Sequence, residues 1–238
     1  MLVLGISTAC AVGGAAAVHG GRTLHEVLTG EESSHAEGLT PAVAEAMAAA
    51  EKAAGRDRPD LVAVARGPGS YTGLRIGVSA AKALAYAWDA DLVGVSTLEA
   101  AARRWLGEGG AVAALLDARR ERVVAAVYEA EGGGLPAARF GPRLLTLDEC
   151  VEALQSQPRP LIVTGEGAEA YKERLEEALA GDAQIPRRAG VLWPADVAAL
   201  GAELYAQGVR HDPFDLAPEY IRKPEAVRNW ERRRLLKS

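Results

Sequence analysis

The 238-residue sequence is poor in the residues that build several common protein classes. It has only two cysteines, Cys10 and Cys150, which lie far apart and have no second thiol near either one. Neither a disulfide framework nor a four-ligand zinc site is indicated, and a reducing cytosol is the expected compartment. No apolar run approaches the ~18 residues of a membrane span, and the first residues lack the basic stretch of a secretion signal. We therefore expect a cytoplasmic protein that is neither exported nor anchored.

An excess of positive charge is also absent. The chain has 27 Lys and Arg residues against 32 Asp and Glu residues, a net charge of -5. Such a chain has no overall field that attracts nucleic acid or an anionic membrane. Hydrophobic residues make up 49% and charged residues 25%, which is typical of a globular chain and excludes a disordered or fibrous one. Any RNA contact is therefore expected to be local or shared with a partner.

The order of predicted elements repeats in the two halves of the chain. Each half begins with a short apolar strand, at residues 2–6 and 111–116, and continues with a hairpin. A second buried strand then leads into a helix, and the first half places this strand at residues 61–65. Two such halves predict a duplicated α/β fold.

The glycine-rich segment Glu108–Gly110 is the best candidate linker between the halves. We therefore expect one lobe over residues 1–107, a second over 108–215, and a basic tail over 216–238. Pro194 opens the last predicted helix, and its packing against the first lobe is left open.

A glycine-rich loop follows the strand at residues 61–65 and opens a helix. Glycines in this place let backbone amides approach a phosphate. The third glycine is one residue late for a dinucleotide-binding loop, no Lys-Ser or Lys-Thr follows, and Pro68 removes one amide. A tight strand-to-helix turn is therefore favoured. This motif loop comprises Gly67, Pro68, Gly69, Ser70, Tyr71, Thr72 and Gly73.

The helix after this loop has a ridge of small residues, because Gly73, Gly77 and Ala81 are spaced four apart. Such a ridge lets another helix come close. Packing of this helix on the chain's own sheet accounts for the apolar residues on one of its faces. The helix is apolar nearly all round, so we predict that a second face contacts another molecule. Arg75 and Lys82 would supply its polar rim. The predicted partner-binding residues are His35, Leu39, Val43, Met47, Leu74, Arg75, Gly77, Val78, Ala81 and Lys82.

No metal or nucleophile pattern is visible. The four histidines show no paired spacing, and the possible acid or base groups Glu99, Asp117, Glu121 and Glu166 are not brought together by the sequence. The last twenty residues hold seven basic side chains against three acidic ones, with Tyr220 and Trp230 between them. They suit RNA phosphates or an acidic partner, and a solvated tail is the alternative.

Several motifs together carry a resemblance to a known family: Leu4-Gly-Ile-Ser-Thr-Ala, Ser34-His35, the block from Gly67 to Gly77, Leu116-Asp-Ala-Arg119 and Pro218-Glu-Tyr-Ile-Arg222. The chain resembles the TsaB (YeaZ) family over essentially its whole length. The resemblance implies a two-lobed actin-like ATPase (ASKHA) fold made of duplicated ribonuclease-H-like domains.

The resemblance also implies a function. Such a chain would be a bacterial, non-catalytic scaffold subunit required for threonylcarbamoylation of the tRNA adenosine next to the anticodon. It would form a heterodimer with the catalytic paralogue TsaD, recruit the ATPase TsaE, and contact tRNA indirectly. The same helices would form a homodimer when TsaD is absent.

One departure from the family pattern bears on catalysis. ATP-hydrolysing relatives use an aspartate after the first strand, where TsaB proteins commonly keep Asp-Thr-Ala; here the sequence is Ser7-Thr-Ala. A serine cannot supply that charge. Ser7, Asp117, Gly165 and Gly167 thus mark a vestigial or possible nucleotide site. No catalytic residue, metal or cofactor is expected in the isolated chain. ATP would bind only at the interface of a complex.

Three rival readings remain at this point. The first is an ATP-binding kinase or ATPase of the actin-like superfamily. The second is a metallopeptidase, for which the ligands are missing from the sequence. The third is a homodimeric regulator without a role in RNA modification.

Overall fold

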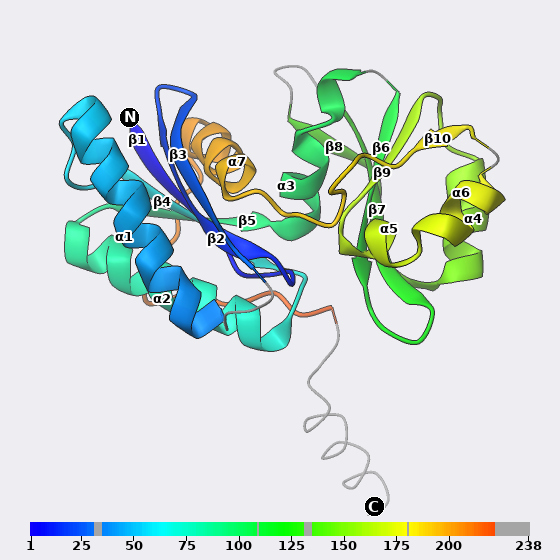
Figure 1. The fold of residues 1–238 in the computed structure, drawn as a ribbon, viewed down its shortest axis with the longest axis horizontal. Coiled ribbons are helices and arrows are strands. Elements are labelled where there is room, and N and C mark those ends of the chain that lie inside the picture. The colour runs from blue at the N-terminus through cyan, green and yellow to red at the C-terminus, as the bar shows by residue number, and fades with distance from the viewer. Residues whose placement is uncertain (31–34, 109, 131–134, 180, 222–238) are drawn as a thin grey trace, which may run out of the picture.

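The computed structural model describes residues 1–30, 35–108, 110–130, 135–179 and 181–221. Two five-stranded sheets lie side by side, each with its own helices (Figure 1). This arrangement confirms the predicted duplicated α/β fold. Most of the predicted basic tail lies outside the described residues. No helix of the described part is long and apolar enough to cross a membrane.

The first sheet has the strand order β3-β2-β1-β4-β5. The strand β1 pairs antiparallel with β2 and parallel with β4, and β4 pairs parallel with β5. Helices α1 and α2 cover one face of this sheet. The elements are β1 (Leu2–Ser7), β2 (Gly13–His19), β3 (Arg22–Thr29), α1 (His35–Ala54), β4 (Leu61–Gly67), α2 (Tyr71–Trp88) and β5 (Asp91–Ser96). The strands β1 and β4 are buried on both faces, as their unbroken apolar runs predict.

The second sheet has the matching order β10-β9-β6-β7-β8. The helix α3 (Thr97–Arg103) and the 3-10 turn η1 (Leu106–Glu108) precede it, so the chain changes sheets at the predicted linker. The remaining elements of this half are β6 (Ala111–Asp117), β7 (Arg122–Ala130), β8 (Pro136–Thr146), α4 (Leu147–Gln155), β9 (Leu161–Thr164), α5 (Glu166–Ala170), α6 (Lys172–Ala178) and β10 (Ala183–Gln184).

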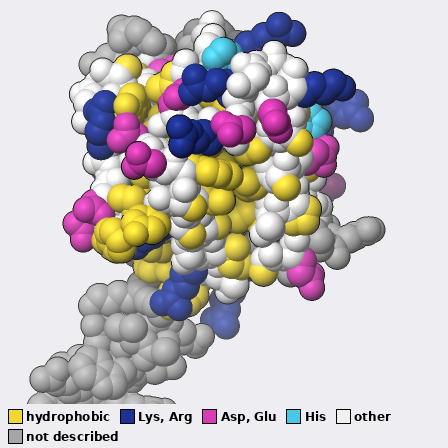
Figure 2. Space-filling model, turned by 90° about the vertical axis from the view of Figure 1, so that its left-hand side faces the viewer, with side chains coloured by type: hydrophobic (Ala, Val, Ile, Leu, Met, Phe, Trp, Pro, Cys, Tyr) yellow, Lys and Arg dark blue, Asp and Glu magenta, His cyan; other side chains and the backbone are white. Residues whose placement is uncertain are grey.

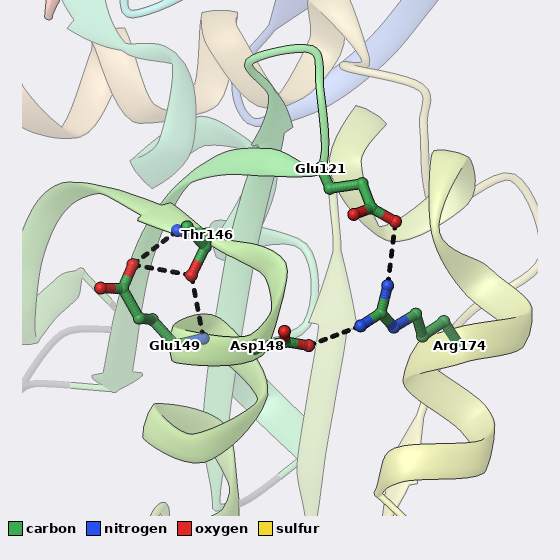
Figure 3. Close-up of polar contacts among 5 residues, drawn as sticks. All are labelled: Glu121, Thr146, Asp148, Glu149 and Arg174. Carbon is green, nitrogen blue, oxygen red and sulfur yellow. Dashed lines mark hydrogen bonds and ion pairs between the residues drawn. The ribbon is translucent and has the colours of Figure 1, made fainter.

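Local polar contacts explain where the helices of the second half begin and how they are tied together (Figure 3). Thr146 caps α4: its hydroxyl accepts from the Glu149 amide, and the Glu149 carboxylate accepts from the Thr146 amide at 2.7 Å. Arg174 on α6 bridges the carboxylates of Glu121 and Asp148. The hydrogen bonds from Thr146 hold the pKa of Glu149 below its usual value.

The last helix, α7 (Pro194–Ala206), packs against β1, β2, β4 and β5 of the first sheet. Gly5 permits this contact, because a Cβ there would overlap the Pro194 carbonyl. The sequence left the packing of this last helix open, and the structure places it on the first sheet, where it covers the face opposite α1 and α2. The lobe bounds 1–107 and 108–215 stay a prediction.

The two sheets also share hydrophobic packing. One continuous core cluster contains Val3 and Leu61 of the first sheet together with Val112 and Tyr128 of the second. The helices α3 and α7 contribute to the same cluster. The two halves are therefore joined through a common core as well as through the linker.

Candidate partner-binding face and motif loop

The motif loop is a tight turn packed against the chain itself. The hydroxyl of Ser70 caps α2 by accepting from the Gly73 amide at 3.2 Å, and the Ser70 amide donates to the Ala9 carbonyl at 2.8 Å. A Cβ on Gly73 would overlap the Thr8 carbonyl. Gly67 has a φ of +135°, a conformation that favours glycine. These contacts account for the glycines through close packing, so the tight-turn interpretation is the better one.

The small-residue ridge of α2 faces inward. A Cβ on Gly77 would overlap the hydroxyl of Thr8, which itself donates to the Gly73 carbonyl at 2.7 Å. Ala81 is fully buried in the core between α2 and the sheet. The prediction that Gly73, Gly77 and Ala81 form an intermolecular ridge was wrong. Small residues are needed here because the helix lies very close to the end of β1.

The other apolar residues of the predicted partner-binding set are core residues as well. None has more than 7% of its surface exposed. Four of them pack in the core between the two helices and the first sheet, namely Leu39, Val43, Met47 and Val78, and Leu74 belongs to the core that the two sheets share. They cannot contact a partner in this structure, which corrects the prediction. A four-residue repeat marks the buried face of a helix, so the pattern selected the core. The side chain of His35 lies outside the described part.

Arg75 and Lys82 do lie on the accessible side of α2, but they bind the chain's own end. Arg75 Nε donates to the Tyr220 hydroxyl at 3.2 Å, and its Cζ lies 4.1 Å from the ring centre of Tyr71. Lys82 Nζ donates to the Leu216 carbonyl at 3.1 Å. Both cations therefore hold the segment that contains the motif Pro218-Glu-Tyr-Ile and the start of the predicted basic tail.

We call this segment, residues 211–221, the strap. The His211 amide donates to the Leu92 carbonyl at 2.8 Å, which attaches the strap to the edge strand β5. Leu216 is only 3% exposed and joins the core beneath α2. The Glu219 amide donates to the Arg66 carbonyl at 2.7 Å. Leu216 stands in a stretch rich in proline and charge, with Asp215 before it and Pro218 two residues after it, so its role carried almost no sequence signal.

The outward side of α1 and α2 is the best candidate interface. Figure 2 looks onto the end of the molecule where these helices lie in Figure 1 and shows hydrophobic side chains gathered there, bordered by charged ones. Tyr86 of α2 is 71% exposed and Phe214 of the strap 77%, the highest values among the large hydrophobic residues described. Their rings form a T-shaped, edge-to-face pair with centroids 5.9 Å apart. Aromatic groups held this way on rigid elements are typical interface anchors.

We call the whole outward side of these helices, with Tyr86 and Phe214, the aromatic face. Its other exposed members on α1 and α2 are Ala36, Glu37, Thr40, Pro41, Ala44, Glu45, Ala48, Glu51, Lys52, Ala53, Tyr71, Thr72, Arg75, Ser79, Ala83 and Ala87. Most of them are small, so a second helix can come close to this face.

The predicted nucleotide-site residues stand at the ends of β1 and β6 and at the start of α5, and all but Ser7 are engaged within the chain. Ser7 is fully buried at the end of β1, and its hydroxyl has no partner among the described residues. Asp117 accepts from the Tyr171 hydroxyl at 3.0 Å and from the Arg119 amide at 2.8 Å. A carboxylate held in this way is already satisfied by protein donors.

The two glycines of this site serve helix packing. A Cβ on Gly165, whose φ is +96°, would overlap the Leu115 carbonyl, and a Cβ on Gly167 would lie 3.0 Å from the Leu115 Cβ. The next residue, Glu166, accepts a hydrogen bond of 3.1 Å from the Ala11 amide of the first half. The turn after β1 and the start of α5 are thus tied to each other across the two halves.

A pocket of about 390 Å³ lies beneath the strap and was not anticipated. It is lined by Arg66, His211, Asp212, Asp215, Leu216, Ala217, Pro218 and Glu219. The pKa of the nearby Glu99 is raised above its usual value. Burial is the main cause and repulsion from Glu219 adds to it, while attraction to Arg66 partly opposes it. Burial, assisted by Arg66, lowers the pKa of His211. Among the described residues no group of three His, Cys, Asp or Glu side chains is placed to hold a metal ion.

Comparison with known proteins identifies relatives of this chain. Residues 29–230 match the protein-family model described as TsaD, tRNA N6-adenosine threonylcarbamoyltransferase. The tRNA threonylcarbamoyladenosine biosynthesis protein TsaB of Bacillus subtilis is 31% identical over 97% of this chain and 98% of its own length. The Escherichia coli protein of the same name is 29% identical over 68% of this chain and 71% of its own.

Solved structures agree with these relatives. A Pseudomonas aeruginosa protein described as similar to peptidase YeaZ superposes with a TM-score of 0.70 and 25% identity, over 93% of this chain and 99% of that one. The predicted two-lobed actin-like fold is therefore confirmed. With this fold, these matches and the motifs quoted above, the chain belongs to the TsaB (YeaZ) family, whose role is in the biosynthesis of threonylcarbamoyladenosine in tRNA.

Proposed function

We propose that this chain is a non-catalytic scaffold subunit that forms a heterodimer with a TsaD-type transferase in the cytoplasm. In this role it supports threonylcarbamoylation of the adenosine next to the anticodon and recruits the ATPase TsaE to the pair. The observation that carries the proposal is the aromatic face, where Tyr86 and Phe214 are 71% and 77% exposed on rigid elements. An aromatic pair left in water at this level is more stable when a partner covers it.

A transferase of the TsaD family is a suitable partner for this face. The chain matches the TsaD family model over residues 29–230, which include both α1 and α2. Two related chains can therefore present corresponding helices to each other in a nearly symmetric contact. A second copy of this chain offers the same helices, so the homodimer is the competing assembly.

The arrangement between the two sheets supports a role without catalysis. The acidic group that ATP-hydrolysing relatives use after the first strand is replaced by the buried Ser7. Gly165 is occupied by close packing on β6, and Glu166 ties α5 to the first half. Because the two sheets share one core, closure of the lobes around a nucleotide would require that core to separate. We therefore propose that the isolated chain needs no cofactor, and that ATP belongs to the assembled complex.

Co-expression with the transferase of the same organism tests the scaffold role. Light scattering on the mixed proteins should show a one-to-one heterodimer that replaces the homodimer. Tyr86→Ala and Phe214→Ala should each weaken it by about tenfold or more, as truncation of an interface anchor does. Phe140→Ala, on β8 of the second sheet, is the matched aromatic control and should leave the heterodimer unchanged.

Two results would contradict the proposal. Heterodimers of the Tyr86→Ala and Phe214→Ala chains with unchanged stability would remove the aromatic face from the interface. Tight binding of magnesium-ATP by the isolated chain would favour the kinase or ATPase alternative. TsaE should join the preformed heterodimer and should not bind this chain alone.

A further inference from the structure

The two rings of the exposed aromatic pair are held in different ways. Tyr86 lies on the helix α2, so its position is set by the backbone of a regular element. Phe214 lies on the strap, in a turn over residues 213–215. Half of the pair therefore depends on how firmly the strap is attached to the rest of the chain.

Asp212 gives the turn of the strap its shape. The Phe214 amide donates to the Asp212 carboxylate at 2.7 Å, and the Leu216 amide donates to the Asp212 carbonyl at 3.0 Å. An aspartate that accepts from the amide two residues later is a common way to form a turn. These bonds lie within the strap, so they shape the turn but do not fix it against α2.

Lys82 joins this turn to α2. Its Nζ atom donates to the Phe214 carbonyl at 3.3 Å and to the Leu216 carbonyl at 3.1 Å, one on either side of Asp215. Lys82 and Tyr86 are four residues apart on the helix, so they lie on the same side of it. Lys82 thus binds the carbonyl of Phe214, and Tyr86 contacts its ring one helical turn later.

The other attachments of the strap lie before and after the ring of Phe214. The His211 amide binds the edge strand β5, and the Glu219 amide binds the end of β4. The side chain of Leu216 is buried in the core. These contacts keep the strap on the protein, whereas the ring of Phe214 is 77% exposed. Loss of the two bonds from Lys82 would therefore loosen the turn without unfolding the chain.

We propose that Lys82 is a positioning residue for partner binding, because it holds the turn of the strap so that Phe214 is presented beside Tyr86. The proposal rests on the proposed function, in which the aromatic face binds a TsaD-type transferase. A group that is already held in its bound position loses less conformational freedom when the partner binds. When only a fraction of the chains has the competent arrangement, the apparent affinity falls by that fraction. Attachment of the strap to α2 therefore sets the strength of the heterodimer.

Hydrogen exchange of the isolated chain, followed by mass spectrometry, tests whether Lys82 holds the strap. Lys82→Met keeps the length of the side chain and removes its donors, so peptides that cover residues 212–217 should exchange several-fold faster. Peptides from β1 and β4 should be unchanged, and so should the melting temperature. Lys172→Met, on α6 of the second half, removes the same charge and is the matched control. It should leave the exchange of the strap unaltered.

Calorimetric titration with the transferase of the same organism tests the consequence for binding. Lys82→Met should weaken the heterodimer by about three- to tenfold. Lys82→Arg should keep most of the affinity, because a guanidinium group can still donate to the two carbonyls. In the Phe214→Ala background, Lys82→Met should have no further effect, because the ring that it positions is gone. A residue that contacted the partner directly would weaken binding equally in both backgrounds.

Three results would overturn the proposal. They are unchanged exchange of residues 212–217 in Lys82→Met, an unchanged affinity of this variant for the transferase, and an equal loss of affinity with and without the Phe214 ring. A chain that forms no heterodimer contradicts the proposed function, and with it the role of Lys82 in binding. The exchange experiment still shows in that case whether Lys82 holds the turn, so the two failures are seen separately.

Discussion

The two halves of the molecule have the same sheet and different helices. Read from the outer hairpin strand, both sheets have one order, β3-β2-β1-β4-β5 in the first and β8-β7-β6-β9-β10 in the second. The helices differ greatly in length: α1 and α2 have 20 and 18 residues, whereas α4, α5 and α6 have 9, 5 and 7. Duplication has thus preserved the sheet. The long helices give the first half a broader outer face than the short helices described in the second half.

In the first half, substitutions that disturb the packing of the long helices should lower the stability of the fold most. Gly77→Val places atoms where the Thr8 hydroxyl lies, so α2 has to move away from β1. We expect a loss of about 3 kcal/mol or more in the free energy of unfolding, or a chain that does not fold. Thermal unfolding measures this. Gly141→Ala in β8, where a Cβ meets nothing within 4 Å, is the matched substitution in the second half and should be nearly neutral.

This result separates the two interpretations of the small-residue ridge. If the Gly77→Val chain keeps its melting temperature but no longer forms the heterodimer, the interpretation of an intermolecular ridge would be correct after all. Joint loss of stability and of partner binding supports the inward-facing ridge described here.

The bond between the halves should have a smaller effect. Glu166→Ala removes the acceptor of the Ala11 amide, and we expect a loss of about 1 kcal/mol and a melting temperature lower by roughly 2–4 °C. Differential scanning calorimetry measures the change. Glu173→Ala, an exposed acidic residue on α6, is the control. Equal melting temperatures for both variants would mean that this bond does not help to join the halves.

Each half also has a glutamate whose pKa is shifted, and the two shifts are opposite. Burial raises the pKa of Glu99, so its contribution favours folding at low pH and is lost as pH rises through the folded-state pKa. Hydrogen bonds from Thr146 lower the pKa of Glu149, so its contribution is present at neutral pH and is lost as pH falls through the folded-state pKa. The two halves therefore respond to acid in opposite ways at these positions.

Two substitutions check this contrast by urea unfolding at several pH values. Glu99→Gln should stabilise the chain at pH 7 relative to the unaltered chain, and the difference should shrink below about pH 4. Glu149→Gln should destabilise it at pH 7, with a difference that also shrinks in acid. Parallel curves across the whole range for either variant would exclude that carboxyl as a source of pH dependence.

The two cysteines should show the smallest difference between the halves, because each half has one cysteine and both are buried. Burial, aided by the nearby Glu166, raises the pKa of Cys10 far above its usual range, and burial raises that of Cys150 to about 12. A neutral-pH alkylating reagent should therefore label neither thiol in the folded chain and both in urea. Mass spectrometry of the labelled protein gives the count. Selective labelling of one cysteine would show that its half opens more readily.

Much of the fold could be predicted from the sequence, because unbroken apolar runs such as residues 61–65 identify strands buried on both faces. The face that we propose for a partner could not. Residues such as Leu39 and Val43 repeat with the helical period, and that repeat identifies the side that faces the sheet. The accessible residues Tyr86 and Phe214 come from distant segments that only the strap brings together.

The return of α7 to the first sheet has a consequence for synthesis of the protein on the ribosome. The sheet face that carries Gly5 stays uncovered until residues 194–206 have emerged, although β5 is complete at residue 96. At roughly 5–20 residues per second, the nascent chain exposes that apolar surface for about 5–20 s. Protection of the growing chain by a ribosome-associated chaperone is therefore most needed while the second sheet is being translated.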